Sequence, residues 1–266
     1  MITIVKKPDF PVLTQLGLRC VDMHYHTTYS DGFADIKDIA EKAKKLGIGI
    51  AITDHNKIDG VLEAEKYPEL FLVPGIEVDC IEGPDLLFYF YTVGELKRFY
   101  KNEIKGCRER DFSGNPKIHL KDIIEKSRDY TCIVAVPHSC HVLWKNAKAF
   151  LKSPKRKHLL DDIDAIETYN GESTMKQNIK AVHWNRELKK PIVGGSDGHC
   201  LFEFGTVVTC TQADTLKDFL DNLLGKKTFT IGKAVSPLGV IIPGTVAFVK
   251  NLNIAMLIFL LKKKGW

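Results

Sequence analysis

The sequence lacks an apolar run long enough to cross a bilayer, which takes about 20 residues. Its most apolar stretch, NIAMLIFLL near the C-terminal end, has nine residues. We expect this stretch to form a buried helix, with a helix on a membrane surface as the alternative. The opening residues MITIVKKPDF also lack the apolar core and cleavage site of a secretion signal. We therefore expect a cytoplasmic protein without a membrane span.

Cysteine pairs at CxxC spacing are absent as well. The chain has seven cysteines, which is an odd number, at irregular spacings. They are Cys20, Cys80, Cys107, Cys132, Cys140, Cys200 and Cys210. This pattern predicts reduced thiols and not a disulfide framework.

A strong excess of one charge is also missing. The 266 residues carry a formal net charge of +5, with 27% charged and 44% hydrophobic residues. This mildly basic balance is compatible with an anionic substrate but too weak to indicate a nucleic-acid binder, so we expect no stable nucleic-acid partner. We interpret the lysine-rich runs KSPKRKH and KKKG as solvated surfaces.

What the chain does have is a regular alternation of apolar, β-branched runs with segments of helical periodicity. We expect strands at residues 19–26, 48–56, 70–80, 85–93, 132–140, 163–171 and 191–199, and helices at 34–47, 59–67, 118–130, 173–190 and 215–225. About seven βα units predict a parallel, closed or nearly closed barrel over residues 20–225. We expect one domain over 1–266, with an extension from about 226 in which KKTFTIGKAVSPLG adds a strand and a lid.

Polar residues stand where the apolar runs end. They are His24, His26, Asp54, His55, Glu77, Asp79, His138, Glu167, Asn170, Asp197 and His199. The carboxyl ends of the strands in a βα barrel meet at one face, where active sites are built. His24 and His26, two residues apart on a strand, would point to the same side. We therefore expect residues far apart in the sequence to form one cluster.

The residue types in this cluster predict a metal centre. Imidazoles together with carboxylates suit zinc, manganese or iron. The candidate ligands are His24, His26, Asp31, His55, Glu77, His138, Asp197 and His199. Any one of these histidines alone is more often structural, but the joint pattern favours metal binding. Eight ligands would serve two or three divalent ions, which would generate a metal-bound hydroxide near neutral pH and hold a phosphoryl group.

The motifs HYHTTYSDG, AITDHN, PGIEVD, VPHS and GGSDGH occur in this order between residue 20 and about residue 200. They resemble the successive motifs of the PHP (polymerase and histidinol phosphatase) family. The resemblance implies an α/β fold, a distorted (β/α)7 TIM-like barrel, with two or three metal ions in a phosphoesterase site. It also implies that His24, His26, Glu77 and Asp197 bind one ion and that Asp31, His55 and His199 bind a second. By the same resemblance Glu77 bridges the ions and His138 belongs to a third site.

The sequence departs from the family pattern at two places. Many members carry a histidine in a context such as HLLGY, whereas this chain reads DLLFYFY, so Asp85 stands there as an oxygen ligand or as a surface residue. Members often read HP at the position of His138, with an arginine nearby for phosphate, whereas this chain reads HSCHVLWK. His141 or Lys145 could replace that arginine, although a surface role for Lys145 is the alternative. Asn170 is a further candidate for substrate binding.

These inferences predict a metal-dependent phosphoesterase that acts on a small phosphate monoester or on a nucleotide or oligonucleotide phosphodiester. Its predicted catalytic residues are Asp31, His55, Asp85 and His199. A histidine or aspartate near the ions would protonate the leaving oxygen. Three alternatives remain open: a histidinol-phosphate phosphatase, a non-catalytic metal-binding PHP module, and a metal-dependent hydrolase of C–N bonds.

Overall fold

The computed structural model describes residues 2–107, 116–140 and 146–233. The strands are β1 (Ile2–Val5), β2 (Arg19–Tyr25), β3 (Gly49–Ile52), β4 (Leu72–Val78), β5 (Leu86–Phe90), β6 (Cys132–Val136), β7 (Ala165–Asn170), β8 (Ile192–Gly195), β9 (Val207–Thr211) and β10 (Phe229–Gly232). The helices are α1 (Phe10–Gln15), α2 (Ile36–Leu46), α3 (Asp59–Ala64), α4 (Val93–Phe99), η1 (Tyr100–Lys105), α5 (Leu120–Ser127), α6 (Ala147–Leu151), η3 (Lys157–Asp162), α7 (Met175–Leu188), η4 (Leu201–Glu203) and α8 (Leu216–Leu224). The predictions for NIAMLIFLL, for the lid, and for His141 and Lys145 lie outside the described residues.

The strands form a curled sheet in the order β1-β10-β9-β2-β3-β4-β5-β6-β7-β8. The pairs β2–β3, β3–β4, β6–β7 and β7–β8 are parallel, as expected for βα units. β5 instead runs antiparallel to both neighbours. Only residues 79–85 join it to β4, which is too short for the crossover that a parallel neighbour needs.

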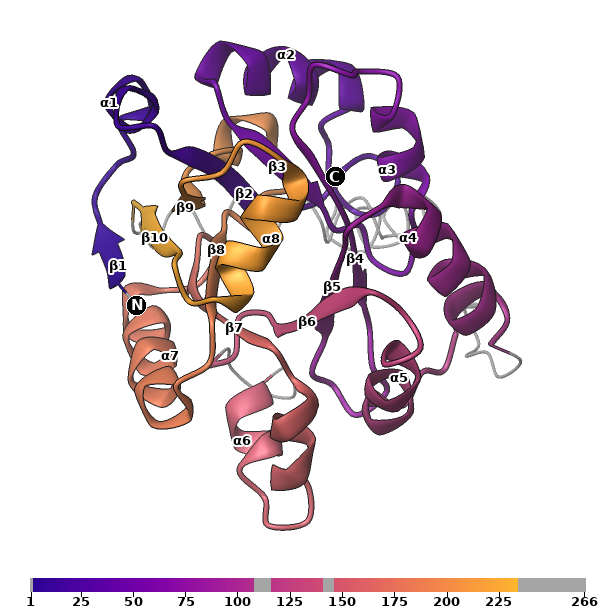
Figure 1. The fold of residues 1–266 in the computed structure, drawn as a ribbon. Helices are drawn as coiled ribbons and strands as arrows, with labels where there is room; N and C mark the ends of the chain where they lie inside the picture. Colours follow the sequence, from indigo (N-terminus) through magenta and orange to yellow (C-terminus); the bar gives the residue numbers. More distant parts are fainter. Residues whose placement is uncertain (1, 108–115, 141–145, 234–266) are drawn as a thin grey trace, which may run out of the picture.

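The sheet curls until the end of β8 meets the end of β2 (Figure 1). The N–H of Asp197 donates to the carbonyl of His24 at 2.8 Å, and the N–H of His26 donates to the carbonyl of Gly198 at 3.0 Å. Gly195 permits this approach, because a Cβ there would lie 2.3 Å from the nitrogen of His24. The contact brings candidate ligands from the first and the last barrel strands together.

Two apolar cores, one inside and one outside the ring of strands, stabilise the barrel. Inside the ring, side chains such as Val21, Met23, Val73 and Tyr89 pack against one another and against Phe219 of α8. Helix α8 therefore fills the amino end of the barrel, and Figure 1 shows it lying across the ring of strands. Outside the ring, α2 to α7 cover the sheet, with side chains such as Ile39, Phe99 and Trp184 in the second core. The carboxyl end stays available for the polar residues.

This architecture confirms the predicted α/β, TIM-like barrel with seven strands, β2 to β8. The helices predicted at 34–47, 59–67, 118–130, 173–190 and 215–225 correspond to α2, α3, α5, α7 and α8. Polar and glycine caps delimit two of these helices, since the Thr174 side chain accepts a hydrogen bond from the Gln177 N–H at the start of α7, and Gly225 follows α8. The sequence reading missed β1, β9, α1, α4 and α6, which are short or lack a clear apolar period.

The prediction that all cysteines are reduced was wrong. Cys20 of β2 and Cys210 of β9 form a disulfide, with Cα atoms 4.2 Å apart. The two residues are register partners in the antiparallel β2–β9 pair, so the strands bring their sulfur atoms together. A sequence separation of 190 residues gives no local spacing from which this pair could be recognised.

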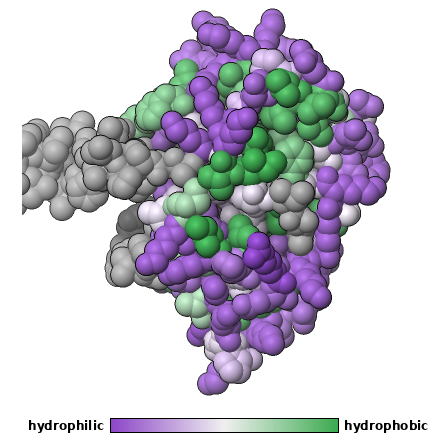
Figure 2. Space-filling model, turned by 90° about the vertical axis from the view of Figure 1, so that its left-hand side faces the viewer, coloured by the Kyte–Doolittle hydropathy of each residue, from purple (hydrophilic) through white to green (hydrophobic). Residues whose placement is uncertain are grey.

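One face of the molecule, formed by β1, α1 and α7, carries a group of apolar side chains (Figure 2). The exposed ones from these elements are Ile4, Val5, Val12 and Ile179. Beside them β1, β7 and α7 line a groove of about 640 Å³. This groove contains none of the candidate ligands. Among the residues that the structure describes, no helix combines the length and the apolar character needed to span a membrane.

Candidate metal centre

The predicted ligands come together at the carboxyl end of the barrel. His24 lies on β2 and Glu77 on β4, while His55, His138 and Asp197 lie two or three residues beyond the ends of β3, β6 and β8. His24 and His26 are fully buried, and Glu77 is 1% exposed. Buried ionisable groups need hydrogen-bond or ion-pair partners, and these side chains are partners of one another. Their donor atoms form five overlapping groups of three, which we describe as three clusters that share residues.

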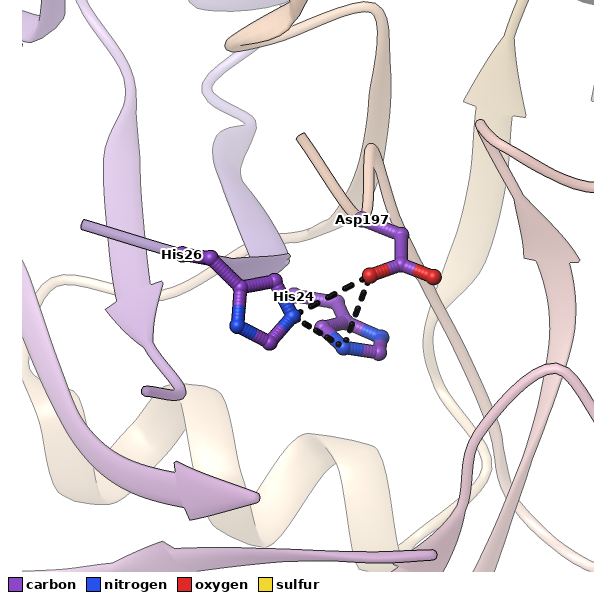
Figure 3. Close-up of side chains that lie close together, drawn as sticks. All are labelled: His24, His26 and Asp197. Atoms are coloured by element: carbon purple, nitrogen blue, oxygen red, sulfur yellow. Dashed lines mark hydrogen bonds and ion pairs between the residues drawn. The ribbon is translucent and has the colours of Figure 1, made fainter. Parts of the chain in front are cut away.

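The first cluster consists of His24, His26, Glu77 and Asp197. Figure 3 shows the imidazoles of His24 and His26 turned toward the carboxylate of Asp197. The two Nε2 atoms lie 3.1 Å apart, and each lies 3.1 Å from Oδ1 of Asp197. Oε2 of Glu77 lies 3.2 Å from the first Nε2 and 3.3 Å from the second. Ligands of a tetrahedral ion at about 2.0–2.1 Å are themselves about 3.3 Å apart, so these four atoms have the spacing of a coordination shell.

The second cluster is built around Asp31, in the loop after β2. Its Oδ2 lies 3.2 Å from Nε2 of His199 and 3.8 Å from Nε2 of His55. Its Oδ1 lies 3.5 Å from Nδ1 of His26, yet both atoms are buried and make no hydrogen bond within the described residues. The ring of His26 stacks between those of His55 and His199, with both centroid distances at 4.6 Å. His26 therefore belongs to both clusters.

The third cluster contains Glu77, Asp85 and His138. Nε2 of His138 lies 3.2 Å from Oε1 of Glu77 and 3.7 Å from Oδ2 of Asp85. Asp85 is 2% exposed, so the alternative that it is a surface residue was wrong. The chain thus places a carboxylate in this cluster, where the resemblance described above led us to expect a histidine in many relatives. Glu77 contributes one oxygen to this cluster and the other to the first.

Two of the candidate ligands have unusual backbone conformations. His138 has a φ of 28° and Asp197 a φ of 52°, both in the left-handed region. Residues other than glycine adopt this region at a cost of about 1–3 kcal/mol, and such strain concentrates at functional sites. Here the strained backbone turns each side chain from its strand end into the centre.

Opposite charges face one another throughout the centre. Burial lowers the pKa of His24, but the carboxylates of Asp197 and Glu77 outweigh it and hold that pKa well above its ordinary value. Burial raises the pKa of Glu77, but the imidazoles of His55 and His24 hold it well below its ordinary value. The carboxylates therefore favour positive charge between them, which a divalent cation would supply. Donor types, spacing and charge all fit zinc, manganese or iron.

Several carboxylates around the clusters were not assigned a role from the sequence. Glu167 lies 3.2 Å from Nδ1 of His24, Asp79 lies 2.7 Å from Nδ1 of His55, and Glu172 lies 3.1 Å from Nδ1 of His199. In each histidine the other ring nitrogen faces a cluster. Outer carboxylates of this kind orient metal-binding histidines. Glu172 had no sequence signal, because it stands in the loop after β7 and not at the end of an apolar run.

Two other strand-end residues serve the surrounding structure. Asp54 accepts hydrogen bonds from the N–H and hydroxyl of Thr27, both at 2.7 Å, and from Ser30 at 2.6 Å, and so anchors the loop that carries Asp31. Asn170 is 2% exposed, and its amide nitrogen donates to Glu167 at 2.9 Å and to Asp197 at 3.0 Å. These contacts favour an orienting role for Asn170, and its contact with substrate stays a prediction.

Comparisons with known sequences point to one family. The model of the PHP domain matches residues 22–177, and the model of a PHP-associated region matches residues 176–228. The uncharacterized protein MJ0417 of Methanocaldococcus jannaschii is 25% identical over 228 residues, which cover 82% of this chain and 84% of the relative.

Two solved structures share the fold. One is a two-domain protein from Bacteroides vulgatus containing a predicted PHP-like metal-dependent phosphoesterase, with a TM-score of 0.61 and 15% identity over 91% of this chain and 73% of that one. The other is the lesion-specific endonuclease PfuEndoQ from Pyrococcus furiosus, with a TM-score of 0.58 and 19% identity over 78% of this chain and 56% of that one. At these identities the likeness shows the fold alone.

Proposed function

Because the chain belongs to the PHP domain family, we propose that it is a metal-dependent phosphoesterase with the three clusters as its catalytic centre. The observation that carries this proposal is the first cluster, in which four donor atoms from β2, β4 and the end of β8 lie at the spacing of a coordination shell. A structural site would need about four ligands, whereas this centre holds more than twice as many.

The proposed distribution of ions follows the clusters. His24, His26, Glu77 and Asp197 would hold the first, Asp31, His55 and His199 the second, and Glu77, Asp85 and His138 a third. When bound, zinc, manganese or iron supplies Lewis acidity to a phosphoryl group and activates water near neutral pH. Glu77 would bridge, because its two oxygens face different clusters.

The described part of the pocket is small and acidic. It has a volume of about 150 Å³ and is lined by Asp31, His55, Glu77, His138, Glu172, Asp197 and His199. Its lining contains no lysine or arginine among the described residues, so bound metal cations would neutralise the negative charge of the phosphate. Pockets that enclose a whole drug-sized ligand are about 300–1,000 Å³. The phosphoryl group would therefore lie inside, with the leaving group toward the mouth.

The exposure of the candidate catalytic residues separates their roles. The side chains of Asp31 and His55 stay 20% and 22% exposed, whereas Asp85 is 2% exposed. Asp31 and His55 are therefore the candidate residues nearest to an entering substrate, where they would hold the second ion beside its phosphoryl oxygen. Asp85 would act through the third cluster, and His199 would orient the second together with Asp31.

A pocket that takes only the phosphoryl group suits either a small phosphate monoester or a nucleotide or oligonucleotide phosphodiester. The fold shared with a lesion-specific endonuclease favours including phosphodiesters in the search. Histidinol phosphate is the first specific monoester to examine, since the same centre would serve its hydrolysis. A non-catalytic metal-binding module is the competing proposal.

We also propose that both matched regions belong to one domain. The PHP region supplies β2 to β7, and the PHP-associated region supplies β8 and β9. These strands share one sheet, and Asp197 and His199 of the second region complete the clusters of the first. The centre would therefore be incomplete without residues 176–228.

The test combines metal analysis with a substrate panel. Protein purified without chelator should carry at least two transition-metal ions per chain by elemental analysis. With added manganese, zinc or iron it should hydrolyse at least one of p-nitrophenyl phosphate, bis-p-nitrophenyl phosphate, histidinol phosphate, nucleotides or oligonucleotides. Less than one ion per chain, unrestored by added metal, would contradict the metal centre. Full metal loading without hydrolysis of any phosphoester would instead support the non-catalytic module.

A further inference from the structure

Glu167 contacts candidate ligands of two different clusters. It stands on β7 and is 1% exposed. Its Oε1 lies 3.2 Å from Nδ1 of His24. Its Oε2 accepts hydrogen bonds from the backbone N–H of His138 at 2.6 Å and from the side-chain amide of Asn170 at 2.9 Å. A buried carboxylate with both oxygens committed in this way is a fixed element of the centre.

We propose that Glu167 is a positioning residue that sets the ring tautomer of His24 and the backbone of His138 for metal binding. The inference rests on the metal centre of the proposed function and not on the hydrolysis of any substrate. According to this proposal, the side chain of Glu167 links the first cluster to the third.

The tautomer of His24 follows from the partner of each ring nitrogen. Nε2 faces His26, Glu77 and Asp197 of the first cluster, so a metal ion would need its lone pair there. The ring proton must then be on Nδ1, where Oε1 of Glu167 can only accept. A carboxylate at this position therefore keeps the correct nitrogen free for the ion.

The effect on His138 acts through its backbone. The φ of 28° is strained, and the short hydrogen bond to Oε2 of Glu167 opposes relaxation to an ordinary conformation. With the backbone held, Nε2 of His138 lies 3.2 Å from Oε1 of Glu77 in the third cluster. Loss of this hydrogen bond would let the imidazole turn away.

Glutamine has the same shape as Glu167 but can replace only part of its role. Its amide has one acceptor oxygen and one donor nitrogen, whereas Glu167 accepts at both oxygens. Two donors, from His138 and Asn170, face the Oε2 position, so the amide oxygen is expected there. The amide N–H would then face Nδ1 of His24. It would favour the tautomer in which Nδ1 carries a lone pair and accepts this hydrogen bond. The ring proton would move to Nε2, the nitrogen that the first cluster needs.

The experiment compares wild type, Glu167→Gln and a matched control, Asp164→Asn. Asp164 directly precedes the same strand, accepts the N–H of Val134 at 2.8 Å and belongs to none of the three clusters. Zinc affinity by calorimetry and zinc stoichiometry by elemental analysis should match wild type in the control. Glu167→Gln should weaken the first-cluster ion about 10–100-fold, the range for residues that orient ligands. Circular dichroism would show that both variants are folded.

A second measurement uses the wild-type protein alone, so it does not depend on how the variant folds. In the zinc-loaded protein, ¹⁵N NMR of histidine side chains should show His24 bound through Nε2 and protonated on Nδ1. Coordination of His24 through Nδ1, or unchanged zinc binding in Glu167→Gln, would overturn the proposal. Because neither readout uses a substrate, a failure to find any phosphoester substrate leaves this inference intact.

Discussion

Oε1 of Glu77 lies 3.2 Å from Nε2 of His138, while Oε2 of the same carboxylate faces the first cluster. A single buried side chain thus joins two groups of ligands that come from opposite sides of the barrel. Both oxygens of Glu77 face candidate ligands, so a change there would affect more than one of the proposed ions. This relationship leads to the first of four predictions.

Glu77→Gln should lose metal and activity together. The substitution keeps the volume but removes the negative charge and turns one acceptor into a donor. We expect a loss of metal affinity and turnover of at least about 10–100-fold, since changes at residues that merely orient ligands already cost that much. Elemental analysis and steady-state kinetics measure both effects. Glu82→Gln is a matched control, because Glu82 also contacts a histidine, His119 at 3.1 Å, but lies outside the clusters. Near wild-type metal content in Glu77→Gln would show that Glu77 is not a bridge.

Substitutions of Asp85 should change the third ion selectively. A carboxylate is a harder donor than an imidazole and suits manganese better than zinc. We expect Asp85→His to raise zinc or iron occupancy, and Asp85→Ala to lose the third ion while largely sparing the other two. Metal stoichiometry at matched metal concentrations distinguishes these outcomes. Three equally tight ions in all three proteins would mean that Asp85 is not a ligand.

Reduction of the Cys20–Cys210 disulfide should destabilise the fold. The bond links strands that are 190 residues apart in the sequence, so it restricts the unfolded chain strongly. Disulfides typically contribute about 2–4 kcal/mol. Thermal unfolding with and without reductant measures the difference, and peptide mapping under non-reducing conditions identifies the bond. Cys132→Ala is the control, and its unfolding should keep the same dependence on reductant. Identical melting temperatures with and without reductant would contradict the prediction.

Gly195→Ala should separate β8 from β2. A Cβ at this position would lie 2.3 Å from the backbone nitrogen of His24. A backbone atom cannot move aside as easily as the end of a flexible side chain. We expect a destabilisation of about 1–3 kcal/mol, typical of overpacking, together with loss of the first ion. Denaturant unfolding and metal analysis report the two effects. Gly94→Ala is the control, because its nearest atom would be 3.7 Å away, and it should be neutral or slightly stabilising. A fully loaded, equally stable Gly195→Ala protein would exclude this close approach.

The sequence by itself determined where strands end and which polar residues stand there. His24 and His26 close an apolar run, and Glu77 and His138 close two others. Since the barrel strands other than β5 share one direction, these local patterns were enough to predict one cluster and a TIM-like fold. The helical periodicity of apolar residues also predicted α2, α5, α7 and α8, because each of these helices buries one face against the sheet.

The tertiary structure decided the contacts between distant segments. Glu167 meets His24 across 143 residues, and Cys20 meets Cys210 across 190. The direction of β5, the burial of Asp85 and the place of Glu172 beside His199 likewise depend on how the sheet curls and closes. Sequence periodicity reports which face of an element is buried, but not which side chain of another element lies against it. That pairing is fixed only when the strands pack in register and the two ends of the barrel meet.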